Sequence, residues 1–426
     1  MSLRAGIVVT GTEVLSGRVS DRNGPWLSER LAEEGVDLAC ITIVGDRPGD
    51  MREALESMAA RGLDLVLTSG GLGPTADDLT AQVVGEFQGR AMVLDEALSG
   101  RIAKIVAPLL KRWPNIDPEA IEQANRKQAT IPEGARILEP VGTAPGLVVP
   151  PSNGSGPTVV VLPGPPRELQ PMWGQALATA ELAETMRAAT TYEQRTLRLF
   201  GIPESEIAET LRIAERDGVD LDRLEVTTCL KRGEVEVVTR FEPPQADLYA
   251  AFEAIVRERH ADTLYSDDGS TVDEQVARLL RTSGRTVATA ESCTGGLLAA
   301  RLTDLAGSSD YFLGAIVAYA NGVKESVAGV PHTTLEAHGA VSGEVAEALA
   351  AAARERVGAD LGVGITGVAG PGGGSEEKPV GLVWLSVQGG EEPITRSVNL
   401  PGGRTDIRDR AGTVAMHLLR RALSGT

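Results

Sequence analysis

Residues 286–296 read Thr-Val-Ala-Thr-Ala-Glu-Ser-Cys-Thr-Gly-Gly. The first five of these residues predict a short β-strand, and the apolar spacing over 297–302 predicts a helix after it. Ser292 and Thr294 therefore stand at a strand-to-helix turn. A helix N-terminus offers unpaired N–H groups and partial positive charge, which favour an oxyanion and attract phosphate. The alternative is structural, because serine and threonine are common helix caps and the two glycines could serve close packing only.

Two later segments supply a base and a second glycine-rich turn. One is Tyr319-Ala320-Asn321-Gly322-Val323-Lys324, and the other runs from Gly364 to Gly374. A lysine kept neutral by desolvation can take the proton of a serine hydroxyl without a histidine. The glycine run follows the apolar stretch 359–365, which places it at the carboxyl end of a strand, where α/β sheets bind ligands. An anion cradle is expected there.

The N-terminal part alternates strand and helix signals. Extended and helical segments are expected in turn at 5–10, 24–34, 36–44, 51–60 and 63–68. This alternation predicts a doubly wound α/β sheet. The last strand runs into a glycine- and aspartate-rich loop, Gly70 to Asp78, which is neither a Walker A loop nor a GxGxxG fingerprint. Its glycines would let a phosphate approach the backbone and its aspartates could hold a divalent cation. A tight connection without a ligand is the alternative.

The composition is that of an ordinary globular protein. A chain of 426 residues, 42% hydrophobic and 23% charged, has the length for about two to four domains. The net charge of −18 argues against a broad nucleic-acid surface, which needs clustered lysine and arginine. The scattered Cys40, Cys229 and Cys293 indicate neither a disulfide framework nor a zinc site. No signal peptide or bilayer-spanning stretch is recognised, so a cytoplasmic location without a membrane partner is expected.

The chain as a whole resembles the CinA family, competence- and damage-inducible protein A. The matching C-terminal segments are Glu291–Gly296, Tyr319–Lys324, Ile365–Gly374 and Pro401–Arg404. This part is similar to the family's nicotinamide mononucleotide amidase domain. By that resemblance Ser292 is the nucleophile and Lys324 is its base. Tyr319 and Thr366 orient the pair or the substrate, and Arg404 faces the nucleotide phosphate.

The resemblance implies acyl transfer that needs no metal or other cofactor. Serine attacks the carboxamide carbon, ammonia leaves, and water releases the carboxylate, while backbone N–H groups hold each oxyanion. The residues expected to bind the substrate are Thr294, Gly295, Gly296, Asn321, Gly367, Gly370 and Arg404. Cys293 is the rival nucleophile, because a thiolate at a helix start can have a lowered pKa. The chain departs from the family pattern at Ala320, where serine is common, and at Gly403, where an acidic residue is common.

The N-terminal part resembles the molybdopterin-binding fold of the MoaB and MogA proteins, in the form that opens CinA proteins. The matching residues are Gly11–Glu13, Asp21, Asn23, Gly45–Asp46, Gly70–Asp78, Asn125, Lys127–Gln128, Gly142–Gly146, Pro163–Gly164 and Glu168. The resemblance implies metal-dependent ADP-ribose pyrophosphatase activity, with Mg²⁺, Mn²⁺ or Co²⁺ and with potassium as a further candidate. Substrate contacts are expected from Gly70, Gly71, Gly73, Thr75, Asn125, Lys127 and Gly164.

Five carboxylates are available for this chemistry: Glu13, Asp46, Asp77, Asp78 and Glu168. Cleavage of a pyrophosphate needs cations that neutralise oxygens and lower the pKa of an attacking water. Asp46 and Asp78 are expected to do the catalytic or metal work, with Glu168 as a third metal ligand. Asp77 could instead be the N-cap of the following helix, and Glu13 a loop charge.

Three domains are expected, at residues 1–172, 173–265 and 266–426. The middle one is similar to a KH-type α+β module, yet it lacks a Gly-x-x-Gly loop and its helices are acidic. RNA binding is therefore disfavoured against a spacer or dimerisation role. The resemblance also implies a homodimer with small nucleotides as ligands. The rival to a two-activity nucleotide enzyme is a pterin- or nucleotide-binding scaffold for competence or recombination partners, without turnover.

Overall fold

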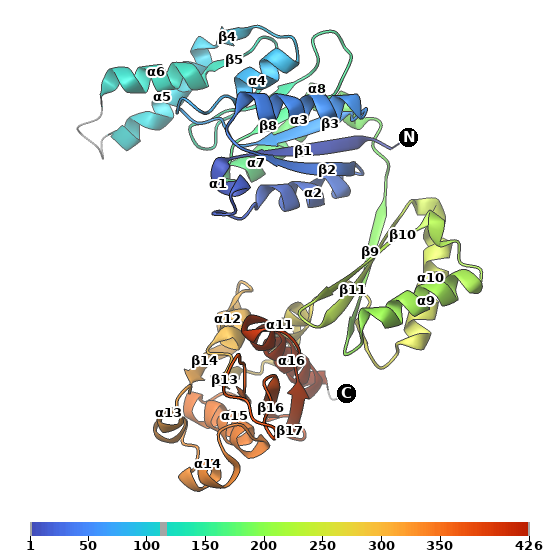
Figure 1. Cartoon of the computed structure of the whole chain (residues 1–426), viewed down its shortest axis with the longest axis vertical. Helices are drawn as coiled ribbons and strands as arrows, with labels where there is room; N and C mark the ends of the chain where they lie inside the picture. The colour runs from blue at the N-terminus through green and yellow to red at the C-terminus, as the bar shows by residue number, and fades with distance from the viewer. Residues whose placement is uncertain (1, 111–116, 425–426) are drawn as a thin grey trace. The chain divides into compact units, whose positions relative to one another are not determined.

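The computed structural model describes residues 2–110 and 117–424, and their contacts divide the chain into two units. The first unit is Met1–Tyr192 and the second is Glu193–Thr426 (Figure 1). In the two described ranges, none of the helices combines the length and the apolar character that a membrane span requires.

The first unit is built on a six-stranded sheet. Its spatial order is β2 (Asp37–Val44), β1 (Arg4–Thr10), β3 (Leu65–Ser69), β8 (Thr158–Leu162), β7 (Gly146–Val149) and β6 (Arg136–Leu138). The first four strands are parallel, and β7 and β6 are each antiparallel to the strand before them. Every residue of β3 and β8 is buried, because both faces of the sheet are covered.

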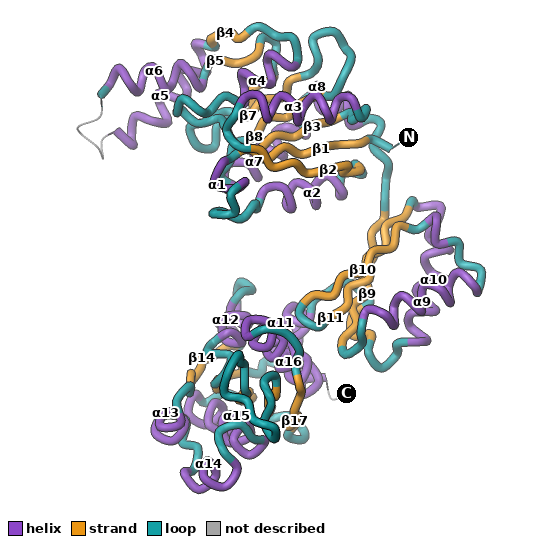
Figure 2. The backbone as a smooth tube through the Cα atoms, viewed as in Figure 1, coloured by secondary structure: helices purple, strands orange, loops and turns teal. Residues whose placement is uncertain are grey.

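Helices lie on both faces of this sheet, as Figure 2 shows. The helices of this unit are α1 (Thr12–Leu15), α2 (Asn23–Glu33), α3 (Pro48–Ala60), α4 (Thr80–Phe87), α5 (Glu96–Leu110), α6 (Pro118–Gln128), α7 (Pro166–Leu177) and α8 (Ala180–Met186). Of these, α5 and α6 lie beside a small antiparallel pair, β4 (Met92–Leu94) and β5 (Thr130–Pro132), and project away from the six-stranded sheet. Val8 and Val66 enter a core with α3 and α4, whereas Ile7 and Leu67 enter a core with α2 and α7. Successive side chains of a strand point to opposite faces of the sheet, so these strands are buried on both faces. The predicted doubly wound α/β architecture is confirmed.

The first unit extends beyond the expected boundary at residue 172. Trp173, Ala176 and Leu182 lie in its core, and the division between the units falls after Tyr192. The apolar faces of α7 and α8 need that core, which is why the boundary lies later. The proline- and glycine-rich stretch 150–157 joins the antiparallel neighbours β7 and β8, so it is a hairpin loop within this unit.

The second unit begins with a four-stranded antiparallel sheet. Its spatial order is β10 (Glu225–Lys231), β11 (Glu234–Phe241), β9 (Glu193–Phe200) and β12 (Leu264–Ser266). One face packs against α9 (Glu204–Arg216) and α10 (Ala246–Arg259) through Leu197, Leu199 and Val237. Short 3₁₀ turns, η1 (Leu221–Arg223) and η2 (Pro243–Gln245), complete it. Residues 193–266 are called the middle module below.

The C-terminal module, residues 267–424, holds a five-stranded sheet. Its spatial order is β14 (Phe312–Val317), β13 (Val287–Glu291), β15 (Leu361–Gly367), β16 (Leu382–Gln388) and β17 (Ile394–Asn399). The first three strands are parallel and the last two antiparallel. The helices are α11 (Val272–Ser283), α12 (Leu297–Thr303), α13 (Asn321–Ser326), α14 (His332–His338), α15 (Gly343–Val357) and α16 (Arg404–Ser424), with the 3₁₀ turn η3 (Ser308–Asp310).

Helices pack on both faces of β15, and α15 lies unusually close to one of them. Leu361, Val363 and Ile365 point into the core formed with α11 and α16. Gly362 and Gly364 point the other way, where a Cβ would lie 2.0 and 2.1 Å from backbone carbonyl oxygens of α15. Only glycine therefore lets α15 approach this closely.

A buried cluster, the clasp, joins the middle module to the C-terminal module. Its members are Phe200, Glu234 and Tyr265 of the middle module and His417 of α16. The His417 ring stacks on Phe200 at 3.7 Å between centroids, and Tyr265 meets its edge at 4.6 Å. The Glu234 carboxylate accepts from the Tyr265 hydroxyl at 2.8 Å and lies 2.7 Å from Nε2 of His417. Burial lowers the pKa of His417, so the ring is neutral at neutral pH and its Nε2–H donates.

The clasp predicts that the second unit loses stability as the pH falls. His417 has a lower pKa in the folded state than in the unfolded chain, where it is near 6.5. The unfolded state therefore binds the proton first, and below that pH the free energy of unfolding should fall by up to about 1.4 kcal/mol per pH unit. Calorimetry of the full chain between pH 5 and 7.5 measures this. His417→Gln should flatten the dependence, whereas His332→Gln, a change at an exposed histidine, should not. Equal slopes in His417→Gln and the parent would contradict the prediction.

Candidate functional site

Three neighbouring parallel strands of the C-terminal module end side by side. β13 lies between β14 and β15, with Glu291 opposite Val317 on one side and Ile365 on the other. The residues that follow these strands start at one edge of the sheet, and they are 292–296, 318–324 and 366–374. They carry the predicted nucleophile, the predicted base and the glycine run. This is the edge at which open α/β sheets bind ligands.

Ser292 and Cys293 follow β13 directly. Ser292 is 7% exposed, and its N–H donates to the carbonyl of Ile365 at 2.9 Å. Cys293 belongs to the apolar core, and burial raises the pKa of its thiol to about 11. A thiol in this state supplies almost no thiolate at neutral pH. The structure therefore favours Ser292 over Cys293 as the nucleophile.

Lys324 is a buried lysine on α13. Its side chain is among the largest fully buried ones, and Nζ donates to the carbonyl of Tyr319 at 3.1 Å. Burial lowers the pKa of its ammonium group, and the only opposing charge effect comes from the thiol of Cys293, the neighbour of Ser292. A lysine that loses its proton easily is suited to act as a base.

Arg404, the first residue of α16, links two of the three loops. Its Nη1 donates to the carbonyl of Gly370 at 2.7 Å and its Nη2 to the Tyr319 hydroxyl at 2.6 Å. Arg404 is exposed, and Tyr319 is 57% exposed. A guanidinium has five N–H donors, so this one keeps donors for a ligand on the open side of the site.

Other predicted residues of this site have structural partners. The Thr366 hydroxyl donates to the carbonyl of Ala340 at 2.6 Å, so it ties β15 to the start of α15 rather than to Ser292 or Lys324. Asn321 is the exposed first residue of α13.

The backbone geometry of the site explains its glycines. Gly295 and Gly296 have φ angles of +62° and +97°, which other residues rarely adopt. Gly370 also has a positive φ. A Cβ on Gly367 would lie 2.7 Å from the carbonyl oxygen of Leu382. Each position therefore requires glycine for the turn or for close packing.

The expectation of unpaired N–H groups at the start of α12 is wrong. The Glu291 carboxylate is fully buried and accepts from the N–H groups of Gly296, Leu298 and Ala299 at 2.9, 3.1 and 2.8 Å. It also accepts from Thr289 at 3.2 Å. An acidic side chain at the end of β13 thus occupies the positive end of the helix. The amides there hold Glu291 and not a ligand.

In the first unit, a cavity of about 350 Å³ collects most of the predicted residues. Among them its walls include Asp46, Gly70, Gly71, Gly73, Asp78, Gly164 and Glu168. The cavity lies at the carboxyl ends of β1, β3 and β8, which are adjacent parallel strands. Glu13 and Asp77 also line it.

Asp46 and Asp78 each accept hydrogen bonds from a nearby threonine. Oδ2 of Asp46 accepts from the N–H and the hydroxyl of Thr12, at 2.9 and 2.8 Å. Oδ2 of Asp78 accepts from the N–H of Thr75 at 2.9 Å. In both carboxylates the hydrogen bonds go to Oδ2, which leaves Oδ1 for a ligand. Asp77 is not the helix N-cap, because α4 is preceded by Leu79; the hydroxyl of Thr75 lowers the pKa of Asp77.

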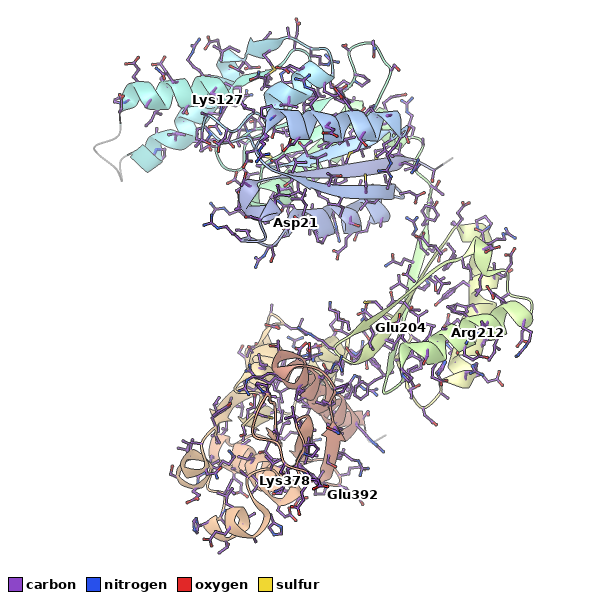
Figure 3. All side chains as sticks on the ribbon, in the orientation of Figure 1. Asp21, Lys127, Glu204, Arg212, Lys378 and Glu392 are labelled. Carbon is purple, nitrogen blue, oxygen red and sulfur yellow. The ribbon has the colours of Figure 1, made fainter. Side chains whose placement is uncertain are left out.

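Asn125 and Lys127 lie on α6, outside the walls of this cavity. Asn125 is buried. Nζ of Lys127, which Figure 3 labels, donates to the carbonyl of Thr75 in the glycine loop. Gln128 donates to the carbonyl of Leu72 in the same loop at 2.9 Å. The structure thus places Lys127 and Gln128 as supports of the loop.

The carboxylates of this cavity do not form a ready metal cluster. In residues 2–110 and 117–424, no group of three histidine, cysteine or carboxylate side chains is placed to hold one ion. Asp46 and Asp78 instead line the cavity from two separate loops, and Glu168 lines it from the first turn of α7. Mg²⁺ commonly binds through one or two carboxylates and keeps several waters. The donor type therefore fits a divalent cation, whereas the expected set of three ligands is not assembled.

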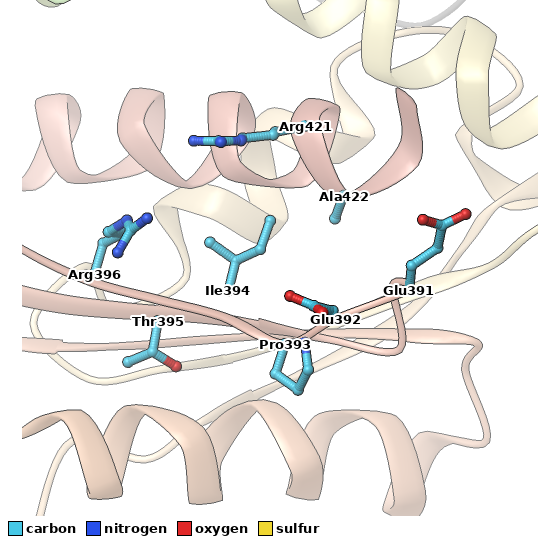
Figure 4. Close-up of a pocket in the computed structure, with 8 residues that line it drawn as sticks. All are labelled: Glu391, Glu392, Pro393, Ile394, Thr395, Arg396, Arg421 and Ala422. Carbon is cyan, nitrogen blue, oxygen red and sulfur yellow. The ribbon is translucent and has the colours of Figure 1, made fainter. Parts of the chain in front are cut away.

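One further cavity, of about 340 Å³, lies between β17 and the end of α16 (Figure 4). Glu391, Glu392, Arg396 and Arg421 are among its walls, and it contains none of the predicted site residues.

Comparison with known proteins agrees with this architecture. The model of the probable molybdopterin binding domain matches residues 6–182, and that of the CinA C-terminal domain matches residues 269–423. The fold and the two matches define a protein that joins these two kinds of domain in one chain.

Full-length relatives carry the same pair of domains. A CinA-like protein of Mycolicibacterium vanbaalenii is 58% identical over 426 residues, which cover 100% of both chains. One of Mycobacterium tuberculosis is 57% identical over 429 residues, covering 100% of this chain and 98% of that protein. The chain belongs to the CinA family. The crystal structure of the competence/damage inducible protein CihA from Agrobacterium tumefaciens has 40% identity and a TM-score of 0.35, covering 36% of this chain and 95% of that one.

Proposed function

We propose that the C-terminal module is an amidase that converts nicotinamide mononucleotide to nicotinic acid mononucleotide and ammonia. The observation that carries the proposal is Lys324, a buried lysine with a lowered pKa in the segment that starts at the same edge of the sheet as Ser292. Such a lysine can deprotonate a serine hydroxyl without a histidine. Arg404, exposed at the same edge of the sheet, supplies the cation that a nucleotide phosphate requires. The resemblance in these segments supports the choice of substrate.

In the proposed reaction, the neutral amine of Lys324 takes the proton of the Ser292 hydroxyl while Oγ bonds to the carboxamide carbon. The C–N bond of the tetrahedral adduct then breaks, and the Lys324 ammonium gives its proton to the departing ammonia. Water attacks the resulting ester with Lys324 again as the base, which releases the carboxylate and restores the serine. Each proton taken by Lys324 is thus returned within one half-reaction.

Ammonia release from nicotinamide mononucleotide, measured with a chelator present, tests this proposal. The intact protein should release ammonia, and Ser292→Ala should lower kcat by at least about 10³-fold. Cys293→Ser is the matched control and should keep most of the activity. Loss of activity in Cys293→Ser with retention in Ser292→Ala would refute the serine mechanism. A complete lack of turnover by the intact protein would favour the scaffold interpretation.

We also propose that the first unit hydrolyses ADP-ribose in its glycine-lined cavity. Its support is the set of carboxylates that share one cavity of about 350 Å³ with the loop from Gly70 to Asp78. The φ angles of Gly70 and Gly71 are positive, and a Cβ would lie 2.6 Å from the Thr10 hydroxyl at Gly70 and 2.1 Å from the Thr80 hydroxyl at Gly71, so the turn requires glycine at both positions. Asp46 and Asp78 would hold a divalent cation (Mg²⁺, Mn²⁺ or Co²⁺), which supplies charge neutralisation and an activated water.

Asp78→Ala tests this second activity. Metal-dependent release of AMP from ADP-ribose should fall by at least about 10²-fold, because one carboxylate oxygen of the proposed cation site is lost. The amidase rate of the same preparation is the internal control, since it belongs to the other unit. An unchanged rate of ADP-ribose cleavage would exclude Asp78 from the chemistry.

A further inference from the structure

A second arginine of α16 contacts the backbone that carries the proposed nucleophile. Residues 292–296 are called the nucleophile loop here. Arg408 lies one helical turn after Arg404, so the two side chains leave the same face of the helix. Its Nε donates to the carbonyl of Cys293 at 3.1 Å and its Nη2 to the carbonyl of Thr294 at 2.8 Å. A Cβ on Gly295 would lie 3.4 Å from the same guanidinium, which therefore runs along the loop backbone.

The nucleophile loop has few other restraints. Its backbone bonds are those of the Ser292 N–H to Ile365, the Gly295 N–H to Ser292 at 3.1 Å, the Leu297 N–H to Thr294 at 3.4 Å and the Ala300 N–H to Gly296 at 2.9 Å. The buried hydroxyl of Thr294 has no hydrogen-bond partner among the described residues. Two consecutive glycines with positive φ follow. Arg408 thus supplies two of the hydrogen bonds that hold the loop to the rest of the module.

The bond to Cys293 also sets the direction of a backbone amide. In a trans peptide the N–H points opposite to the C=O. Because Arg408 draws the carbonyl of Cys293 toward α16, the N–H of Thr294 in the same peptide points away from α16. No backbone carbonyl of the described residues accepts from it. Burial raises the pKa of the Cys293 thiol and the backbone N–H of Thr294 opposes that effect, so this amide faces the thiol of its own loop.

We propose that Arg408 is a positioning residue of the amidase site, which fixes the nucleophile loop and so keeps Ser292 in place for catalysis. This inference rests on the proposed amidase function. Among the described residues, Arg408 donates its hydrogen bonds to backbone carbonyls, so its role is geometric. A displacement of about 1 Å in a catalytic constellation can cost about 10²-fold in rate.

The first test compares Arg408→Met with Arg410→Met in the full chain. Arg410 is a matched control, because it lies on the same helix and donates to one backbone carbonyl, that of Pro401, at 3.0 Å outside the loop. Arg408→Met should lower kcat for nicotinamide mononucleotide by about 10- to 100-fold and change KM less than about 3-fold. Arg408→Lys, which keeps the charge and one donor, should recover part of kcat. Arg410→Met should keep both parameters.

The second test does not depend on turnover. In a Cys40→Ser, Cys229→Ser background, Cys293 is the only thiol, and it is 6% exposed. Its reaction with a maleimide should be slow in the parent and in Arg410→Met. It should be at least about 10-fold faster in Arg408→Met, because the loop is released, and intermediate in Arg408→Lys.

The outcomes separate the two claims. If the intact protein has no amidase activity, the proposed function fails, and the thiol rate alone decides whether Arg408 holds the loop. Unchanged thiol rates in both Arg408 variants would overturn the positioning role, even where kcat falls, because Arg408 would then act on the substrate. If Arg408→Met does not fold, Arg408→Lys is compared with the parent instead. A kcat and a thiol reaction rate in Arg408→Lys that both equal those of the parent would overturn the proposal.

Discussion

Replacement of Lys324 by methionine should lower kcat for nicotinamide mononucleotide by about 10²- to 10⁴-fold, the range that a general base contributes. Methionine keeps the length and the apolar stem of the lysine but cannot accept a proton. Lys324→Arg should fail as well, because a guanidinium keeps its proton at any accessible pH. Combined with Ser292→Ala, the change should cost little more, since both residues serve one step.

The role of Lys324 as a base also predicts how kcat/KM changes with pH. Burial lowers the pKa of Lys324 from its ordinary 10.5, so the fraction of neutral amine at a given pH is larger than in water. The value of kcat/KM should rise with pH while Lys324 loses its proton and then level off. Lys324→Met should lose this rise. Steady-state kinetics between pH 6 and 10 measure it.

Lys378→Met is the matched control for Lys324→Met. Lys378 also donates Nζ to a backbone carbonyl, that of His338 at 2.7 Å, but it is far less buried (Figure 3). Its replacement should keep kcat within about 2-fold. Lys324→Met should stay folded, because it removes a cation whose burial is costly. A folded Lys324→Met protein with parental kcat would exclude Lys324 as the base.

Glu291→Ala should destabilise the C-terminal module by roughly 3–5 kcal/mol, the largest stability effect expected in this chain. The change removes the acceptors of three N–H groups at the start of α12 and leaves a cavity at a fully buried position. Each buried donor without a partner costs about 1–3 kcal/mol. Glu291→Gln keeps one acceptor oxygen and should cost less, about 2 kcal/mol.

Glu274→Ala provides the control, because the Glu274 carboxylate also accepts from a backbone N–H at a helix start, that of Thr271 before α11, but at an exposed position. Its loss should cost only about 1 kcal/mol. Urea denaturation of the full chain measures both effects, and hydrogen exchange of the amides in α12 locates the damage. Equal losses for Glu274→Ala and Glu291→Ala would show that burial adds nothing to the second cap.

Local patterns predicted the strands that end at the C-terminal site. The apolar run 359–365 and the extended run 286–290 lie within two residues of the observed β15 and β13. Because both strands are parallel and adjacent, Ser292 and the glycine run had to start at the same edge of the sheet. Hydrophobic periodicity carries this information, since each strand must fill a core on both faces.

The same patterns could not predict how the side chains at this edge are used. Glu291 ends a buried strand, and nothing in its neighbours shows that its carboxylate turns back to cap α12. Arg408 reaches the nucleophile loop across 115 residues of sequence, which leaves no periodic trace. The hydrogen bond from the Thr366 hydroxyl to the carbonyl of Ala340 could not be predicted either, because it also joins residues far apart in the sequence. Contacts of this kind depend on tertiary packing.

The first unit shows a similar division. Asp46 and Asp78 were expected to act together in metal or catalytic work, and both line the cavity that the glycine loop also lines. Lys127 was expected to contact a phosphate, yet it supports the loop from α6 through Thr75. A lysine near a phosphate loop can do either, and only the placement of α6 distinguishes the two.

The length of α16 has a consequence for insertions and deletions. This 21-residue helix holds Arg404 and Arg408 near its start and His417 of the clasp two to three turns later. One added residue turns everything beyond it by about 100° and shifts it by about 1.5 Å. An insertion between Arg408 and His417 would therefore rotate the two ends of α16 relative to each other. Either the arginines or His417 would then lose their hydrogen-bond partners. Variation in the length of this family's last helix should be confined to the segment after the clasp.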